Sequence, residues 1–178
     1  MAYIAVEEGV PGIRSLFQFS PETGRPLCEL AEVLLRGPSP LSPAERELIA
    51  AHVSHRNDCI FCRNSHAAAA RCLFGRDKQV VDELLHEERD RLLSEKMKAL
   101  LVLAGEVQLG GLSLRPADIK AARDAGADDN DIHDTVLIAA SFSMFNRYVD
   151  GLASLTPTNE SDYLEMGKRM SEKGYHIE

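Results

Sequence analysis

Residues 41–66 read LSPAERELIAAHVSHRNDCIFCRNSH, and this segment contains two helix starts and the chain's densest group of reactive side chains. Ser42 precedes Pro43, and Glu45 follows at the third helical position. A capping serine, an early proline and a glutamate three residues after the cap are typical of a helix N-terminus. The pattern predicts a helix over residues 42 to 55.

A second helix follows after a short interruption. Asn57 and Asp58 break or kink the chain, and an aspartate side chain can cap the next helix. Helical periodicity then runs from Cys59 through four consecutive alanines to Leu73, and Gly75 ends it. We therefore expect the cysteines to open a helix that Asp58 caps.

Helical periodicity also covers most of the remaining chain. Further helices are predicted over residues 27–35, 78–86, 94–107, 115–125, 129–152 and 161–171. The residues before 27 contain proline and glycine too often for a long element, so we expect an irregular stretch with one short helical piece. The segment 129–152 is apolar on most of its circumference, which favours a central position or a subunit interface. Strand-like alternation is almost absent, so the predicted fold class is all-α, an antiparallel array of about seven to nine helices.

Composition limits the classes of function. The 178 residues are 44% hydrophobic and 27% charged, as in one ordinary globular domain, and no linker or repeat divides them. With 20 basic and 28 acidic residues the net charge is −8, and no basic run offers a nucleic-acid surface. The N-terminus does not resemble a secretory signal, and the longest apolar run is too short to span a membrane. We expect a cytoplasmic protein whose four cysteines do not form a disulfide framework.

The spacing of Cys59, Cys62 and His66 indicates redox chemistry. At about 100° per residue the three side chains share one stripe of a helix, with Cys62 one turn before His66. The positive end of the helix dipole and a neighbouring imidazole both favour a thiolate, whereas a free thiol has a pKa of about 8.5. The base favours Cys62 as the reactive thiol, and the helix end favours Cys59.

Glu47 lies on the preceding helix, twelve residues before Cys59. Pairing of the two helices could bring its carboxylate to His66, where it would fix the tautomer and stabilise the protonated ring. Ser54 shares the helix face of Glu47. Glu45, two positions earlier, is an alternative carboxylate for this role.

Other readings of these residues remain open. A structural zinc site could use the two cysteines and His66 with His52 or His55, although no second cysteine pair is present. Cys28 and Cys72 are predicted to be buried small apolar residues, and His55 to lie on the surface. Arg147 could bind an anionic substrate or pair with Asp150, and Asn146 is expected to form hydrogen bonds in the core.

Residues 41–66 resemble the core of the AhpD-like alkylhydroperoxidase and carboxymuconolactone decarboxylase superfamily, and more narrowly its peroxidase-related branch. The resemblance rests on a glutamate, eleven intervening residues, Cys-x-x-Cys and a histidine four residues further on. Asn146 and Arg147 extend it over roughly residues 10–155. It implies a single AhpD-like domain over residues 1–178, with a core over about 10–155 and a C-terminal helical extension over 156–178.

The resemblance also implies a mechanism. Cys62 would be the peroxidatic cysteine, Cys59 would donate a proton and close the disulfide, and His66 and Glu47 would form a proton relay. The implied substrate is a small hydroperoxide, without a cofactor or metal, and an external lipoyl or thioredoxin-like dithiol would regenerate the enzyme. A homo-oligomer, a trimer or hexamer, is expected. Phe61 stands where the characterised alkylhydroperoxidase has a histidine.

Two alternatives remain beside the peroxidase. Ring-opening lactone decarboxylation occurs in the same superfamily, but that branch does not use the Cys-x-x-Cys pair. The other alternative is a non-catalytic zinc or redox-sensing module.

Overall fold

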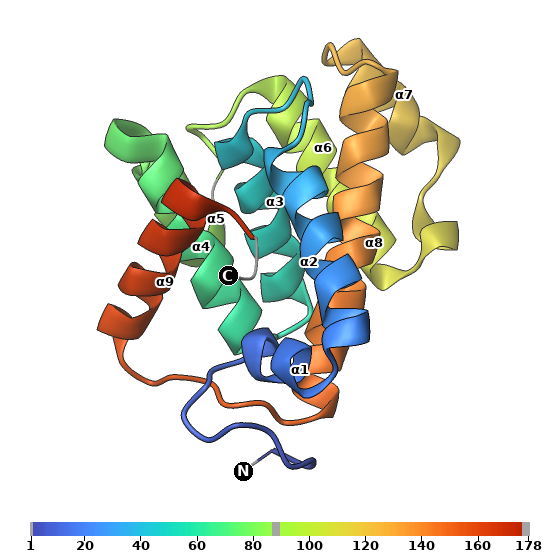
Figure 1. Ribbon diagram of the computed structural model, residues 1–178. Helices are drawn as coiled ribbons and strands as arrows, with labels where there is room; N and C mark the ends of the chain where they lie inside the picture. Colours follow the sequence, from blue (N-terminus) through green and yellow to red (C-terminus); the bar gives the residue numbers. More distant parts are fainter. Residues whose placement is uncertain (1, 87–89, 176–178) are drawn as a thin grey trace.

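The computed structural model describes residues 2–86 and 90–175, and in these residues the chain is helical with no strand (Figure 1). The predicted all-α class is confirmed, and nine α-helices are present in the described ranges. They are α1 (Ile13–Phe19), α2 (Pro21–Arg36), α3 (Pro43–Arg56), α4 (Ile60–Phe74), α5 (Gln79–His86), α6 (Glu95–Leu109), α7 (Pro116–Asp124), α8 (Asp129–Gly151) and α9 (Glu160–Lys173), with short 3₁₀ turns at Gly75–Asp77 and Gly111–Ser113.

The helices α3 and α4 form the central antiparallel pair. The predicted capping box begins α3: Ser42 Oγ accepts the Glu45 backbone N–H at 3.3 Å, and the Glu45 carboxylate accepts the Ser42 N–H at 2.8 Å. Nine of the fourteen residues of α3 are buried, because other helices cover it on most sides.

The turn between α3 and α4 differs from its prediction. Asp58 does not cap α4; it adopts a left-handed conformation with φ of 56°. The Cys59 N–H binds the Ser54 carbonyl and the Asp58 N–H binds the His55 carbonyl, both at 3.0 Å, which is a Schellman motif ending α3. Aspartate is one of the few non-glycine residues that tolerate this conformation. The N-cap of α4 is therefore Cys59.

Before residue 27 the predicted short helical piece is present as α1, but the prediction of an otherwise irregular chain was wrong, because α2 already begins at Pro21. Pro21 occupies a first-turn position, where its missing N–H is not needed, and Pro26 follows little more than one turn later. Gly24 allows the close approach of α1: a Cβ there would lie 2.7 Å from the Phe17 backbone. Packing against α1 thus stabilises a helix that its local sequence disfavours.

Two further layers cover the central pair. In Figure 1, α6 and α8 lie on one side of α3, and α9 lies along α4 on the other. Buried side chains such as Ile138 and Phe142 place one face of α8 in the core, whereas Leu137 and Met144 are 38% and 44% exposed. No helix of the described ranges combines the length and apolarity needed to cross a bilayer.

The C-terminal segment is part of the packed structure. Gly167 places α9 directly on α4, since a Cβ at this position would lie 2.6 Å from the Ala68 backbone. After α9 the chain returns to the centre of the molecule, where the Tyr175 N–H binds the Glu32 carboxylate of α2 at 2.7 Å. Residues 176–178 of the predicted extension lie outside the described residues.

The contact between α9 and α4 gives a first prediction. Gly167→Ala should lower the free energy of unfolding by about 1–3 kcal/mol, because the added methyl group overlaps the α4 backbone. Gly151→Ala is the matched control: it is also helical, but nothing lies within 4 Å of its Cβ position. This variant should be neutral or more stable by up to about 1 kcal/mol in urea unfolding. Equal stability of the two variants would contradict close α4–α9 packing.

Candidate active site

A buried carboxylate lies at the centre of the candidate site. Glu47 of α3 is 0% exposed, and its Oε2 lies 2.7 Å from Nδ1 of His66 on α4. The structure thus brings together the two side chains that sequence spacing suggested. Because Nδ1 faces the carboxylate, Nε2 is the ring nitrogen left to exchange a proton.

Glu47 has two further partners that the sequence did not indicate. Oε1 accepts a hydrogen bond from Arg36 Nη2 at 2.5 Å and from the Tyr175 hydroxyl at 2.5 Å. The Arg36 guanidinium also lies 5.2 Å from the centre of the Tyr175 ring, and that ring stacks on His66. Arg36 ends α2 and Tyr175 follows α9, and no local motif marks either residue.

These partners keep Glu47 ionised. Burial alone raises the pKa of a carboxyl, but the charges of His66 and Arg36 and the hydrogen bonds from His66 and Tyr175 outweigh it. The pKa of Glu47 is therefore held below its ordinary value. Burial and the Glu47 charge raise the pKa of Tyr175 well above its ordinary value, so its hydroxyl remains a donor.

The two thiols lie at the start of α4 and are reduced. Cys59 is the N-cap and lies outside the helical stripe that was expected, but its side chain contacts Cys62 in the first turn. The hydrogen bond with Cys62, and then burial, raise the pKa of Cys59. Cys62 lies four residues before His66, so the two side chains leave the helix on the same face.

A cavity of about 220 Å³ reaches His66, between α1, α2, α4 and α9. Phe61 and Ser65 also line it, whereas the two thiols do not; Cys59 is 0% and Cys62 3% exposed. The cavity therefore reaches the histidine and not the two sulfurs.

The residues proposed for a zinc site do not cluster. Among the side chains that the structure describes, no group of three or more His, Cys, Asp or Glu could hold a metal ion. His52 and His55 line a different hollow, against α6. Burial, and then the charge of Arg56, lower the pKa of His52 to about 4.

Asn146 and Ser54, which the sequence also singled out, form hydrogen bonds that hold the fold together. Asn146 donates to Ser54 Oγ at 3.0 Å and accepts from Asn57 at 2.9 Å, which confirms its expected core hydrogen bonds. Ser54 donates to the Ala50 carbonyl and is not a partner of Glu47. These contacts join the α3–α4 turn to α8.

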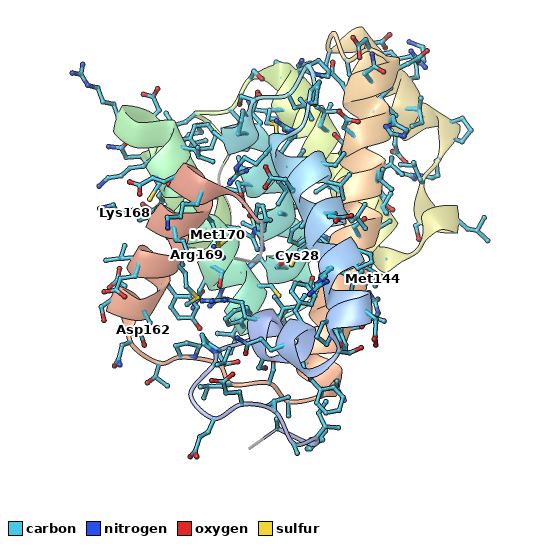
Figure 2. The ribbon with its side chains drawn as sticks, viewed as in Figure 1. Cys28, Met144, Asp162, Lys168, Arg169 and Met170 are labelled. Atoms are coloured by element: carbon cyan, nitrogen blue, oxygen red, sulfur yellow. The ribbon has the colours of Figure 1, made fainter. Side chains whose placement is uncertain are left out.

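Arg147 and Cys72 lie on the surface, whereas Cys28 is buried. Arg147 is exposed and donates to the Ser143 carbonyl at 2.8 Å, and no ion pair with Asp150 forms. Cys28 is buried, as predicted, and lines the cavity. The prediction that Cys72 is buried was wrong; it lies near the end of α4, where no neighbouring helix covers it, and is exposed. In Figure 2, Cys28 belongs to α2, and Arg169 and Met170 belong to α9.

Comparison with known proteins supports the resemblance. Residues 21–106 match the model of the carboxymuconolactone decarboxylase family. An uncharacterized peroxidase-related protein from Silicibacter sp. TM1040 is 30% identical, with 87% of this chain and 79% of that chain covered and a TM-score of 0.77. This chain belongs to the carboxymuconolactone decarboxylase family.

A second family structure has the same fold. The alkylhydroperoxidase AhpD core of an uncharacterized peroxidase-related protein from Ralstonia eutropha JMP134 is 24% identical, with 89% of this chain and 82% of that chain covered and a TM-score of 0.77. No curated protein matches the chain. Glu47, Cys59, Cys62 and His66 lie inside the matched family region, and Tyr175 lies outside it.

The hydrogen bond from Tyr175 gives a second prediction. Tyr175→Phe should cost about 1.5–3 kcal/mol of unfolding free energy at pH 7, because a buried carboxylate loses a donor while the ring is retained. The folded-state pKa of Glu47 is depressed, so the stabilisation is present above its unfolded value of 4.5 and is lost as pH falls through the folded pKa. The cost should therefore shrink in acid, as measured by urea unfolding at several pH values.

Tyr148→Phe is the matched control, because the Tyr148 hydroxyl makes no hydrogen bond within the described part of the chain. A pH-independent cost in Tyr175→Phe, or an equal cost in both variants, would contradict the assigned hydrogen bond.

Proposed function

We propose that this protein is a thiol-dependent peroxidase that reduces hydroperoxides through a Cys59–Cys62 dithiol and disulfide cycle. The observation that carries the proposal is the buried Glu47 carboxylate on Nδ1 of His66, one helical turn from Cys62. The similarity to an uncharacterized peroxidase-related protein supports the same class of reaction.

In the first step His66 Nε2 takes the Cys62 proton, and the carboxylate of Glu47 stabilises the imidazolium that forms. The thiolate attacks the distal oxygen of ROOH, so the S–O bond forms as the O–O bond breaks. Sulfur loses two electrons, and the departing alkoxide takes the proton back from His66. The products are Cys62 sulfenic acid and the alcohol ROH.

In the second step Cys59 resolves the sulfenic acid. Its sulfur attacks Cys62, the S–S bond forms, and hydroxide leaves with the Cys59 proton as water. The raised pKa of Cys59 suits a thiol that keeps its proton while Cys62 reacts. An external dithiol then reduces the disulfide by exchange and is itself oxidised.

Arg36 and Tyr175 act in this proposal as positioning residues. Both hold Oε1 of Glu47, which leaves Oε2 directed at His66. Preorganised partners of this kind limit the rearrangement that proton transfer would otherwise require.

We further propose that a lipoyl or thioredoxin-like dithiol reduces the enzyme, and that the protein is a homo-oligomer, a trimer or hexamer. The partly exposed Leu137 and Met144 of α8 support a self-association surface. The contact between Cys59 and Cys62 argues against the decarboxylase alternative, since that branch does not use the pair.

The third prediction tests the nucleophile. Cys62→Ser should abolish hydroperoxide-dependent oxidation of a dithiol donor, measured by consumption of cumene hydroperoxide. Cys59→Ser should stop after one equivalent, with a sulfenic acid that dimedone traps at Cys62. Cys72→Ser is the control, because Cys72 is exposed near the other end of α4. Turnover in Cys62→Ser at the wild-type rate would refute the proposal.

The fourth prediction tests the relay. Glu47→Gln should move the pH of half-maximal alkylation of Cys62 by iodoacetamide upward by about one unit, because a neutral amide stabilises the imidazolium less. Glu45→Gln is the control, since glutamine also serves in a capping box and Glu45 contacts only Ser42 in its own turn. An unchanged pH profile in Glu47→Gln would remove Glu47 from the mechanism.

A further inference from the structure

The cavity beside His66 combines apolar walls with cationic side chains. Its apolar lining comes mainly from Ile13, Phe17, Phe61, Met166 and Met170. Arg14 of α1 and Arg169 and Lys173 of α9 also line it, and among the described residues no Asp or Glu does. A cationic cavity is notable in a chain with a net charge of −8.

Arg14 and Arg169 have no anionic partner among the residues that the structure describes. No carboxylate of the described residues lies within salt-bridge distance of Arg14 or Arg169, although most other arginines described form such pairs or hydrogen bonds. Asp162 and Glu165 border a neighbouring hollow that both arginines also line, but neither carboxylate forms an ion pair with them.

The two arginines border the same part of the cavity. Arg14 of α1 and Arg169 of α9 both line it, and both also line the neighbouring hollow, together with Met166. Their side chains therefore lie along the edge that the two hollows share. Paired guanidinium groups are well suited to bind one carboxylate.

We propose that the cavity selects hydroperoxides that carry a carboxylate at the end of an apolar chain. This inference rests on the proposed peroxidase function and names its substrate class. Arg14 and Arg169 hold the carboxylate, the chain lies against Phe17 and Met166, and the hydroperoxide group reaches His66. The volume of about 220 Å³ suits an aliphatic acid of about ten carbons or fewer, since pockets for larger, drug-sized ligands are about 300–1,000 Å³.

Phe61 contacts both the cavity and the covered thiols. It lines the cavity, and it packs in one cluster with Cys59 and Cys62. A carboxylate anchored at the two arginines directs the other end of the ligand to the His66 side of the cavity, one helical turn from Cys62.

The binding test needs no turnover. Decanoate should bind the full chain in isothermal titration calorimetry, with an affinity that falls as sodium chloride is raised. Arg14→Gln and Arg169→Gln should each weaken binding about tenfold, which is typical of losing one charged hydrogen bond, and Arg169→Lys should weaken it less. Arg76→Gln is the control, because Arg76 is exposed on the 3₁₀ turn after α4 and does not line the cavity.

The kinetic test compares a hydroperoxide of decanoic acid with its methyl ester. Wild type should have a KM for the acid about tenfold below that for the ester. Arg14→Gln and Arg169→Gln should raise the KM of the acid with little change in kcat, leave the ester unaffected, and together remove the preference.

The outcomes separate the two proposals. If acid and ester are reduced equally well and decanoate does not bind, the substrate inference is overturned while the peroxidase stands. If decanoate binds in an arginine-dependent manner but neither hydroperoxide is reduced, the carboxylate site is supported and the peroxidase is overturned. Unchanged decanoate affinity in both arginine variants overturns the assigned site.

Discussion

Burial of an ionised carboxylate costs several kcal/mol unless charged or hydrogen-bonding partners replace the lost water. Glu47 meets this requirement with three groups from three segments: Arg36 at the end of α2, His66 on α4, and Tyr175 after α9. The positions of these segments around α3 are therefore coupled through one side chain. The same contacts that stabilise Glu47 leave His66 with one free ring nitrogen beside Cys62.

The start of α4 imposes the second constraint on the site. A Schellman turn reverses the chain between α3 and α4 and places Cys59 at the N-cap and Cys62 in the first turn. Asn57 and Asn146 hold this turn to α8 by hydrogen bonding. The two cysteines thus lie on a hydrogen-bonded turn and the helix that follows it, which suits the proposed disulfide because a disulfide needs a specific geometry.

The proposed chemistry and the proposed recognition come from different parts of the chain. Glu47, both thiols and His66 lie within residues 21–106, which match the family model. Arg14 lies before that region, and Arg169 and Tyr175 lie after it. Helices α1 and α9 therefore supply the cationic side of the cavity, while α3 and α4 supply the relay. Such a division allows substrate preference to change without disturbing the dithiol.

The sequence by itself determined the features that depend on local interactions. Helix periodicity and the Ser42 capping box indicated an all-α chain and the start of α3, and the spacing of Cys59, Cys62 and His66 led to the proposed redox site. Predictions from local sequence were wrong at two places. Pro26 lies inside a helix, because packing of α1 on Gly24 supports that helix. Asp58 does not cap α4, because the Schellman turn uses its backbone and not its carboxylate.

Only the tertiary structure decided which distant residues meet at the site. Arg36 and Tyr175 are separated from Glu47 by 11 and 128 positions, and neither belongs to a local motif. The sequence spacing left Glu45 and Glu47 as rivals, and packing of α3 against α4 resolved them because it turned Glu47 inward and left Glu45 at the cap. The physical reason is that helix formation depends on neighbours a few residues apart, whereas neutralising a buried charge depends on whichever side chains the folded chain brings within hydrogen-bonding distance.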